Sequence, residues 1–256
     1  MFGAIAGDVI GSVYEHSPIK TEDFPLFHPR CCFTDDTVMT VAIAYAILES
    51  MDYALAMKTF GRQYPHAGYG SAFIKWIFEE DVRPYNSWGN GAAMRVSPIG
   101  FAFDDMESVL LEAKRSAEVS HNHLEGIKGA QAAALAVFLA RKGESKEEIR
   151  KQVTQICGYD LNHTIEEMRP AYTFDLSCQG SVPQAIIAFL ESSGYEDAIR
   201  KAISLGGDSD TLACITGGIA QAYYKRIPPE IVNTVRRILP ADLLNVVERF
   251  NHRFGI

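Results

Sequence analysis

Two aspartates and a threonine stand at the start of an apolar run in the stretch LGGDSDTLAC, residues 205–214. Asp208 and Asp210 follow two glycines, and Thr211 opens the apolar run. Aspartate and threonine are favoured helix N-caps because their oxygens accept hydrogen bonds from free backbone N–H groups. One interpretation is therefore a capped helix, and the other is a binding site.

A second cluster of the same composition lies more than 170 residues away in the stretch CFTDDTVMT, where Thr34, Asp35 and Asp36 precede another apolar run. A further acid, Glu15, ends the stretch GAIAGDVIGSVYE. A cap requires one residue, whereas each cluster has two acids and a hydroxyl. Side chains one or two positions apart on a regular helix point in different directions, so only an irregular terminus lets neighbouring acids converge.

Two such termini facing each other would supply four carboxylates and two hydroxyls. These ligands are all oxygens, which hard cations such as Mg²⁺, Mn²⁺ and Ca²⁺ prefer. Four carboxylates offset the charge of two divalent ions, which predicts a two-metal site with the ions roughly 3.5–4 Å apart. Without metal, the carboxylates would repel one another and their pKa values would rise.

The other polar features suggest a ligand-binding loop. Gly89, Asn90 and Gly91 form a loop that can bring backbone N–H groups close to a ligand, although an ordinary turn before a helix has the same composition. Ser120 and His121 lie at a predicted junction between helices. Isolated histidines are more often structural than catalytic, and the neighbouring His123 leaves the choice open.

One cation and several aromatic residues lie near these loops. Arg95 can pair either with a phosphate or with a surface acid. The aromatic residues can stack on a base, but packing in the core is their default role; they are Tyr14, Tyr64, Tyr69, Tyr85 and Trp88.

Helical periodicity dominates the elements that must position these residues, and strand patterns are scarce. We expect an all-α fold of around ten helices in a single domain, residues 1–256. Ser145 and Glu148 form a capping-box pattern, and the segments 61–70 and 83–100 are expected to be ordered loops. The predicted helices are 36–50, 106–120, 123–143, 145–156, 182–192, 195–205, 210–226, 228–239 and 241–254.

The composition limits which binding partners and which cellular compartment we expect for this protein. The net charge is −8, from 24 basic and 32 acidic residues, with no dense basic run, so nucleic acid is not expected as a main partner. Five cysteines without metal-ligand spacing indicate reduced thiols in a cytoplasmic protein. Asp8 interrupts the apolar first residues, which lack a basic start, so we expect neither a signal peptide nor a membrane span.

Taken together, these segments resemble the ADP-ribosylglycohydrolase family, which includes the dinitrogenase-reductase-activating glycohydrolase and the ADP-ribosylarginine hydrolases, and they are most similar to its short bacterial branch. Each segment alone is a weak signal, but their shared order along nearly the whole chain is specific. The matching segments are GAIAGDVIGSVYE, FTDDTVMT, GNGAAMRVSPIG, SHNHLEGIKGAQAAA, CQGSVPQAIIAFL and AISLGGDSDTLACITGGIAQAYY.

The resemblance implies an orthogonal helical bundle with a binuclear Mg²⁺ or Mn²⁺ centre. Its implied metal ligands are Thr34, Asp35, Asp36, Asp208, Asp210 and Thr211. Glu15 matches an acid on a flap near the metals, and Glu15, Asp35 and Asp36 are the candidates for catalytic proton transfer. Gly89, Asn90 and Gly91 match the loop that holds the diphosphate and ribose, and Ser120 with His121 matches a pair beside the ligand.

The activity implied is hydrolysis of the bond at C1″ of the distal ribose in an ADP-ribosyl conjugate, through an oxocarbenium-like transition state. The substrate would be an ADP-ribosylated protein or small molecule. One alternative is a non-enzymatic protein of the same fold that binds ADP-ribose or is structural. Another is a metal-dependent phosphohydrolase, which usually uses adjacent His-Asp ligands, and the chain has no such dipeptide.

Overall fold

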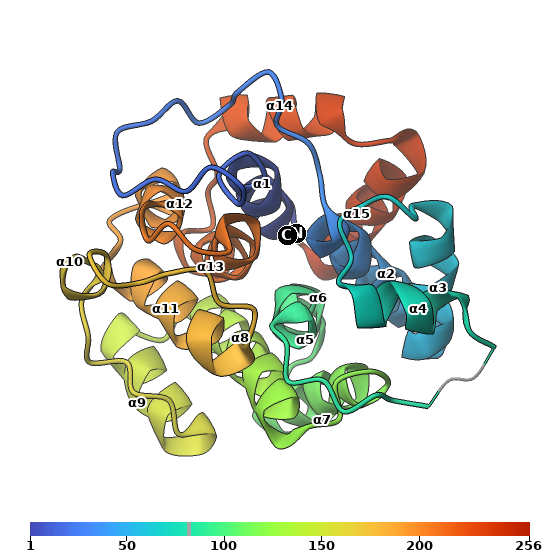
Figure 1. The fold of residues 1–256 in the computed structure, drawn as a ribbon. Helices are drawn as coiled ribbons and strands as arrows, with labels where there is room; N and C mark the ends of the chain where they lie inside the picture. The colour runs from blue at the N-terminus through green and yellow to red at the C-terminus, as the bar shows by residue number, and fades with distance from the viewer. Residues whose placement is uncertain (81–82) are drawn as a thin grey trace.

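The described residues, 1–80 and 83–256, of the computed structural model form fifteen helices and no β-sheet, so the all-α prediction is confirmed (Figure 1). Gly89 and Ser177 form an isolated antiparallel bridge. In chain order the helices are α1 (Phe2–Gly11), α2 (Asp35–Glu49), α3 (Tyr53–Gln63), α4 (Ser71–Phe78), α5 (Gly91–Met94), α6 (Ser97–Ala102), α7 (Met106–Glu118), α8 (Leu124–Lys142), α9 (Lys146–Cys157), α10 (Ile165–Met168), α11 (Cys178–Glu191), α12 (Tyr195–Ser204), α13 (Ser209–Tyr224), α14 (Pro229–Ile238) and α15 (Ala241–Phe254).

Helices α1 and α13 lie side by side near the middle of the molecule (Figure 1). Gly3, Gly7 and Gly11 are four positions apart and therefore share one face of α1. A Cβ at Gly7 would lie 2.0 Å from the carbonyl oxygen of Ala213, and one at Gly3 would lie 2.4 Å from that of Gly217. The two backbones therefore touch in antiparallel order, which brings the end of α1 to the start of α13.

The other long helices surround this pair and bury a continuous apolar core. Residues 132–140 of the alanine-rich helix α8 are all buried, as expected for a helix that is apolar on nearly every side. The ammonium group of Met1 donates a hydrogen bond of 2.9 Å to Asn251 in α15, which ties the two ends of the chain together. Among the described residues, no helix is both long and apolar enough to cross a membrane.

All nine helices predicted from periodicity are present, but the expected number, around ten, is too low. The prediction of an ordered loop over 83–100 is wrong in part, because it contains α5 and the start of α6. Pro98 occupies the first turn of α6, where proline is tolerated, so it does not break the helix. The other predicted loop, 61–70, begins inside α3. Four of the missed helices, α4, α5, α6 and α10, contain too few turns to show a period, whereas α1 and α3 are at least as long as the predicted α12 and were missed all the same.

The predicted capping box at the start of α9 is only half formed. The side chain of Ser145 accepts a hydrogen bond from the backbone of Glu148, but the Glu148 side chain accepts one from Gln152 instead of reaching back. A complete capping box occurs at α10, between Thr164 and Glu167. One half of the pattern is enough to start α9.

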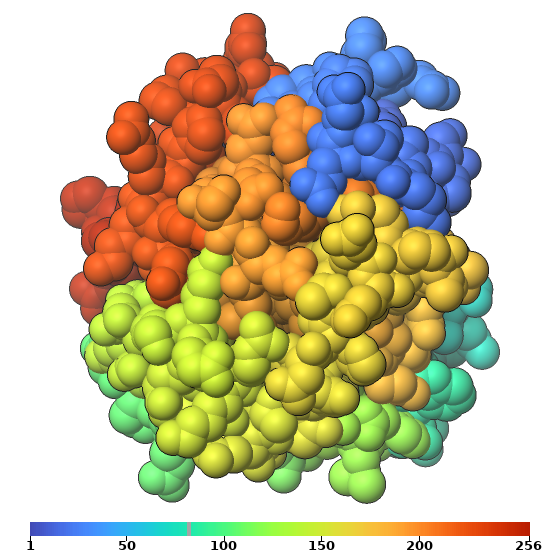
Figure 2. Space-filling view, turned by 90° about the vertical axis from the view of Figure 1, so that its left-hand side faces the viewer, coloured from blue at the N-terminus to red at the C-terminus, as the bar shows by residue number. Residues whose placement is uncertain are grey.

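The segment between α1 and α2, which carries Glu15, lies against α10 and α12 (Figure 2). The ammonium group of Lys20 donates a 2.5 Å hydrogen bond to the carbonyl of Tyr172 and another to that of Leu205, at the end of α12. Glu22 forms ion pairs with Arg169 and Lys201. These bonds fix the segment beside the loop that leads into α13.

Candidate metal centre and substrate cavity

The start of α2 presents the first acid cluster. Thr34 is the N-cap, and its hydroxyl accepts a hydrogen bond of 3.3 Å from the backbone N–H of Asp36. Asp35 and Asp36 occupy the first turn, where the positive end of the helix dipole favours carboxylates. Asp36 is buried and Asp35 is partly exposed. The capping interpretation therefore holds for Thr34 and leaves the two acids for another role.

The start of α13 presents the second cluster. Gly206 has φ +67°, a conformation that glycine adopts without strain, and it turns the chain sharply before Asp208. A capped helix was one interpretation of this stretch, but the side chain of Asp208 makes no capping hydrogen bond. Its Oδ2 instead accepts a hydrogen bond of 2.6 Å from the side-chain amide of Asn90. The capping interpretation is therefore wrong for Asp208, whose carboxylate bonds to a different part of the chain.

The two clusters touch each other. The hydroxyl of Thr211 donates a 3.2 Å hydrogen bond to Oδ2 of Asp36. The hydroxyl of Thr34 donates one of 2.7 Å to Asp8 and accepts one from the backbone N–H of Asp36, which leaves one lone pair for a cation. The other oxygen of Asp36, Oδ1, is buried without a hydrogen-bond partner in the described chain. An unpartnered buried carboxylate oxygen is expected where a metal ligand has no metal.

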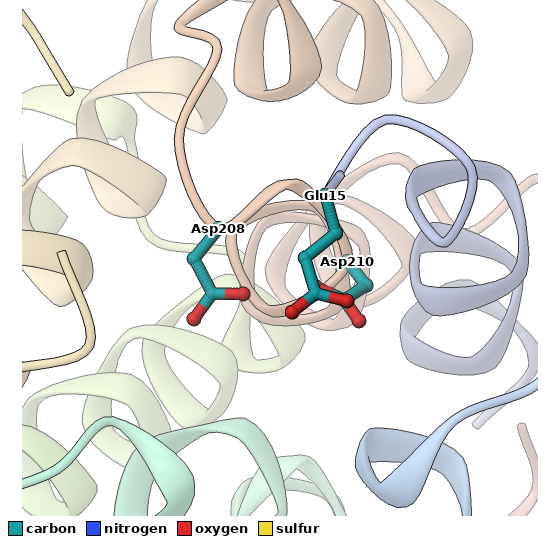
Figure 3. Close-up of side chains that lie close together, drawn as sticks. All are labelled: Glu15, Asp208 and Asp210. Atoms are coloured by element: carbon teal, nitrogen blue, oxygen red, sulfur yellow. The ribbon is translucent and has the colours of Figure 1, made fainter. Parts of the chain in front are cut away.

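Glu15 joins the second cluster from the loop after α1. One carboxylate oxygen each from Glu15, Asp208 and Asp210 lies within 4.8 Å of the other two, a spacing that a shared cation can span. In the close-up, Asp208 approaches from the loop before α13, while Glu15 reaches over Asp210 from the opposite side (Figure 3). The contact between α1 and α13 makes this meeting possible, since it places the end of one helix at the start of the other.

Asp8 is a site residue that the sequence interpretation missed. Its fully buried carboxylate accepts hydrogen bonds from the backbone N–H groups of Thr34 and Thr37, both at 3.0 Å, and from both threonine hydroxyls. Asp8 thus caps α2 from another helix and holds Thr34 in place. A lone acid in an apolar helical segment was the signal, but we interpreted it only as an argument against a signal peptide.

Burial and the repulsion between carboxylates raise the pKa values of Asp8, Glu15, Asp35, Asp36 and Asp208. Burial is the larger cause for Asp8, whose pKa rises to about 7, and the charge of Asp210 adds to it. The same two causes raise the pKa values of Asp35, Asp36 and Asp208 well above the usual value, and that of half-buried Glu15 to a smaller extent. Divalent cations would relieve this repulsion, and the all-oxygen donor set matches their preference.

The predicted ligand loop meets the second cluster directly. Besides the bond to Asp208, the side-chain amide of Asn90 donates a 3.0 Å hydrogen bond to Ser181, so its two N–H groups are used inside the protein. The backbone N–H of Asn90 bonds to the carbonyl of Leu176 at 2.8 Å. Gly89 and Gly91 both line the cavity. The loop therefore holds Asp208 with the side chain of Asn90 and places both of its glycines at the cavity wall.

Ser120 and His121 lie beside the glycine loop. His121 lines the cavity, while fully buried Ser120 lies behind it, with Oγ 2.8 Å from Nδ1 of His121. Burial and the nearby charge of Arg95 lower the pKa of His121 well below its usual value. A Cβ at Gly91 would lie 3.2 Å from Nε2 of His121, so this edge of the ring faces the glycine loop.

The cavity has a volume of about 420 Å³. The acid clusters and Glu15 line one part of its wall, and Arg95 and His121 line another. The wall also contains residues that were not predicted as ligand-binding, among them Phe73, Phe174 and Leu176, while Tyr85 had been noted only among the aromatic residues near the loops. Phe174 and Leu176 are about half exposed. Isolated apolar residues, in a loop or in the short helix α4, carry no local signal of a ligand.

Comparison with known proteins agrees with this geometry. The family model described as ADP-ribosylglycohydrolase matches residues 1–255. The chain is 29% identical to ADP-ribosylhydrolase ARH3 of Bos taurus, over 87% of this chain and 83% of that protein. It is 24% identical to ADP-ribosylarginine hydrolase Tri1 of Pseudomonas putida, over 92% and 72% respectively. A solved structure titled "ADP-ribosylglycohydrolase-related protein complex" has a TM-score of 0.71 and 22% identity, covering 93% of this chain and 96% of that one.

Proposed function

Because this chain belongs to the ADP-ribosylglycohydrolase family, we propose that it is a metal-dependent hydrolase that cleaves the bond at C1″ of the distal ribose in ADP-ribosyl conjugates. The product is ADP-ribose, and the role is the removal of ADP-ribose from modified proteins or small molecules. The two named relatives are hydrolases of this kind by name. We place the reaction in the cytoplasm, in keeping with five free cysteines.

The observation that carries the proposal is the contact between Thr211 and Asp36. It joins two oxygen-rich helix termini at a cavity that also holds a cation, Arg95. A substrate that fits this cavity has sugar hydroxyls for the acids and an anionic group for Arg95. The distal ribose and the diphosphate of ADP-ribose supply these two groups.

We propose that Thr34, Asp35, Asp36, Asp208, Asp210 and Thr211 hold two divalent cations, Mg²⁺ or Mn²⁺. When bound, such cations supply positive charge that orients ribose hydroxyls and lowers the pKa of a nucleophilic water. Asp8 holds Thr34 in place by hydrogen bonds, and Asn90 holds Asp208. The positions of the ligands thus depend on two buried side chains outside the ligand set.

We assign the two proton transfers of the reaction, from the attacking water and to the leaving group, to the carboxylates that line the cavity. Asp35 or Asp36 can accept a proton from the attacking water, and Glu15 can protonate the leaving group. A raised pKa suits Glu15 to this role, because a general acid must still hold its proton near neutral pH. Glu15 is also half-buried at the cavity wall, where a leaving group would depart.

A non-enzymatic binding or structural protein of the same fold is the weaker candidate, because such a role does not need four carboxylates that repel one another without metal. The deciding experiment is a panel of defined conjugates, ADP-ribosyl-arginine, ADP-ribosyl-serine and an acetyl ester of ADP-ribose, incubated with Mg²⁺, Mn²⁺ or chelator. We expect metal-dependent release of ADP-ribose from at least one conjugate. Binding of ADP-ribose without turnover of any conjugate would support the weaker candidate.

A further inference from the structure

Arg95 is a fully buried cation whose Nε and Nη1 have no hydrogen-bond partner in the described chain. Its Nη2 donates two hydrogen bonds, 2.8 Å to the carbonyl of Ser116 and 3.1 Å to the hydroxyl of Ser120. No carboxylate of the described residues forms an ion pair with it. Burying a charge without an ion-pair partner costs folding free energy, so the presence of Arg95 at the cavity wall requires a functional explanation.

The hydrogen bonds of Ser120 determine which ring nitrogen of His121 carries the proton. Arg95 can only donate, so the hydroxyl oxygen of Ser120 accepts from it. The hydroxyl hydrogen of Ser120 then has one acceptor nearby in the described chain, Nδ1 of His121 at 2.8 Å. If Nδ1 carried the proton instead, the hydrogen of this buried hydroxyl would have no partner, which is unfavourable. The neutral ring therefore has its proton on Nε2.

The surroundings also keep the ring neutral. In the described chain, the ionisable groups beside the imidazole are Arg95 and Tyr85, whose ring centre lies 5.8 Å from that of His121. The charge of Arg95 disfavours a second positive charge, and burial raises the pKa of Tyr85 to about 12, so Tyr85 carries no charge near neutral pH. Phe73 packs on the same ring at 6.2 Å.

We propose that Arg95, acting through Ser120, fixes His121 as the neutral tautomer protonated on Nε2, so that His121 donates a hydrogen bond to a phosphate oxygen of the substrate and transfers no proton. Nε2 faces the glycine loop and has no hydrogen-bond partner in the described chain, and the positive charge of Arg95 behind the ring favours an anionic acceptor. Arg95 and Ser120 are then positioning residues. The identity of the ligand rests on the proposed function, whereas the tautomer follows from the geometry of the free protein.

Nitrogen-15 NMR of histidine-labelled full-length protein with Mg²⁺ tests the tautomer. Signals of His121 are identified by their loss in His121→Gln. We expect a protonated Nε2, an unprotonated Nδ1 and no titration between about pH 5 and 8. A protonated Nδ1, or titration in this range, would overturn the proposal. Partly exposed His123 provides a control, since His123→Gln should leave the His121 signals unchanged.

Three substitutions test whether Ser120 and Arg95 determine the tautomer of His121. Ser120→Ala should give a mixture of tautomers and weaken binding of ADP-ribose roughly tenfold, while Ser120→Thr restores the hydroxyl and the single tautomer. An unchanged tautomer in Ser120→Ala would exclude a role for Ser120. Arg95→Met should raise the pKa of His121 into the measured range, and the Ser120 variants keep the test valid if Arg95→Met does not fold.

The ligand is tested by adding compounds to the wild-type protein. ADP-ribose, AMP and ribose 5-phosphate should shift the Nε2 signal, whereas adenosine should not. An equal shift with adenosine would exclude phosphate as the acceptor. If the tautomer is as expected but ADP-ribose neither binds nor shifts any signal, the proposed function fails while the assignment of the tautomer stands.

Discussion

The side-chain amide of Asn90 lies 2.6 Å from Oδ2 of Asp208, a residue 118 positions away. This bond links the glycine loop at the cavity wall to an acid of the proposed metal centre. Asn90 also bonds to Ser181 at the start of α11, so the amide is held from both sides. We therefore regard Asn90 as a support for Asp208, whose orientation depends on it.

Asn90→Ala should weaken metal binding roughly 10- to 100-fold, as expected when a residue that orients a metal ligand is removed. Calorimetric titration with Mn²⁺ measures the change. Asn162→Ala is the matched control, because Asn162 is exposed and bonds only to nearby Asp160. Equal Mn²⁺ affinity in the two variants would show that Asp208 is positioned without Asn90.

Asp210→Ala should abolish turnover while leaving the fold intact. Its carboxylate raises the pKa values of Asp8, Glu15, Asp35, Asp36 and Asp208 by repulsion, so removing it should not destabilise the metal-free protein. We expect a loss of more than about 100-fold in Mn²⁺ affinity. This loss is larger than the one expected for Asn90→Ala, because Asn90 only orients a metal ligand. Urea unfolding with chelator measures stability. Full metal binding and turnover in Asp210→Ala would falsify the assignment of the metal site.

Glu15→Gln should slow turnover according to the leaving group. A general acid matters most for a basic leaving group such as arginine, and such catalysis contributes roughly 10²- to 10⁴-fold. The ratio of wild-type to variant kcat should therefore be large for ADP-ribosyl-arginine and small for an acetyl ester. The same ratio for both conjugates, accompanied by weaker Mn²⁺ binding, would instead make Glu15 a metal ligand.

The metal-free protein should lose stability as the pH rises from about 4 to about 7. The folded-state pKa of Asp8 is about 7, above its ordinary value of 3.8, so the folded state binds more protons than the unfolded state across this range. Each pKa unit corresponds to about 1.4 kcal/mol, which makes the contribution of Asp8 on the order of 4 kcal/mol. Thermal unfolding in chelator measures the trend, and Mg²⁺ or Mn²⁺ should reverse it. A rise in melting temperature over this range would contradict the cluster electrostatics.

Gly7→Ala should destabilise the protein and disturb the metal centre together. The new Cβ would lie 2.0 Å from the backbone of Ala213, so α1 must move away from α13, at a cost of about 1–3 kcal/mol or more. The shift also moves Asp8 and Glu15, which should lower Mn²⁺ affinity. Gly194→Ala is the control, because nothing lies within 4 Å of a Cβ there. Similar unfolding midpoints for the two variants would contradict the close contact between α1 and α13.

The sequence by itself determined nine of the fifteen helices and the two oxygen-rich clusters. Periodicity and helix termini are local, since they depend on residues within one or two turns. Thr34 could therefore be recognised as a helix start, and the composition of the clusters indicated cations before any contact was known. The order of the family segments added the substrate class.

Tertiary structure alone decided how these pieces meet. The backbone contact between α1 and α13 brings Asp8 to the start of α2 and Glu15 to Asp210, and no local pattern encodes contacts between such distant segments. Asp208 bonds to Asn90, where one interpretation of the sequence was a helix cap. A cap needs only the nearest free N–H groups, whereas the direction of a buried carboxylate is set by whichever donors the folded chain places around it.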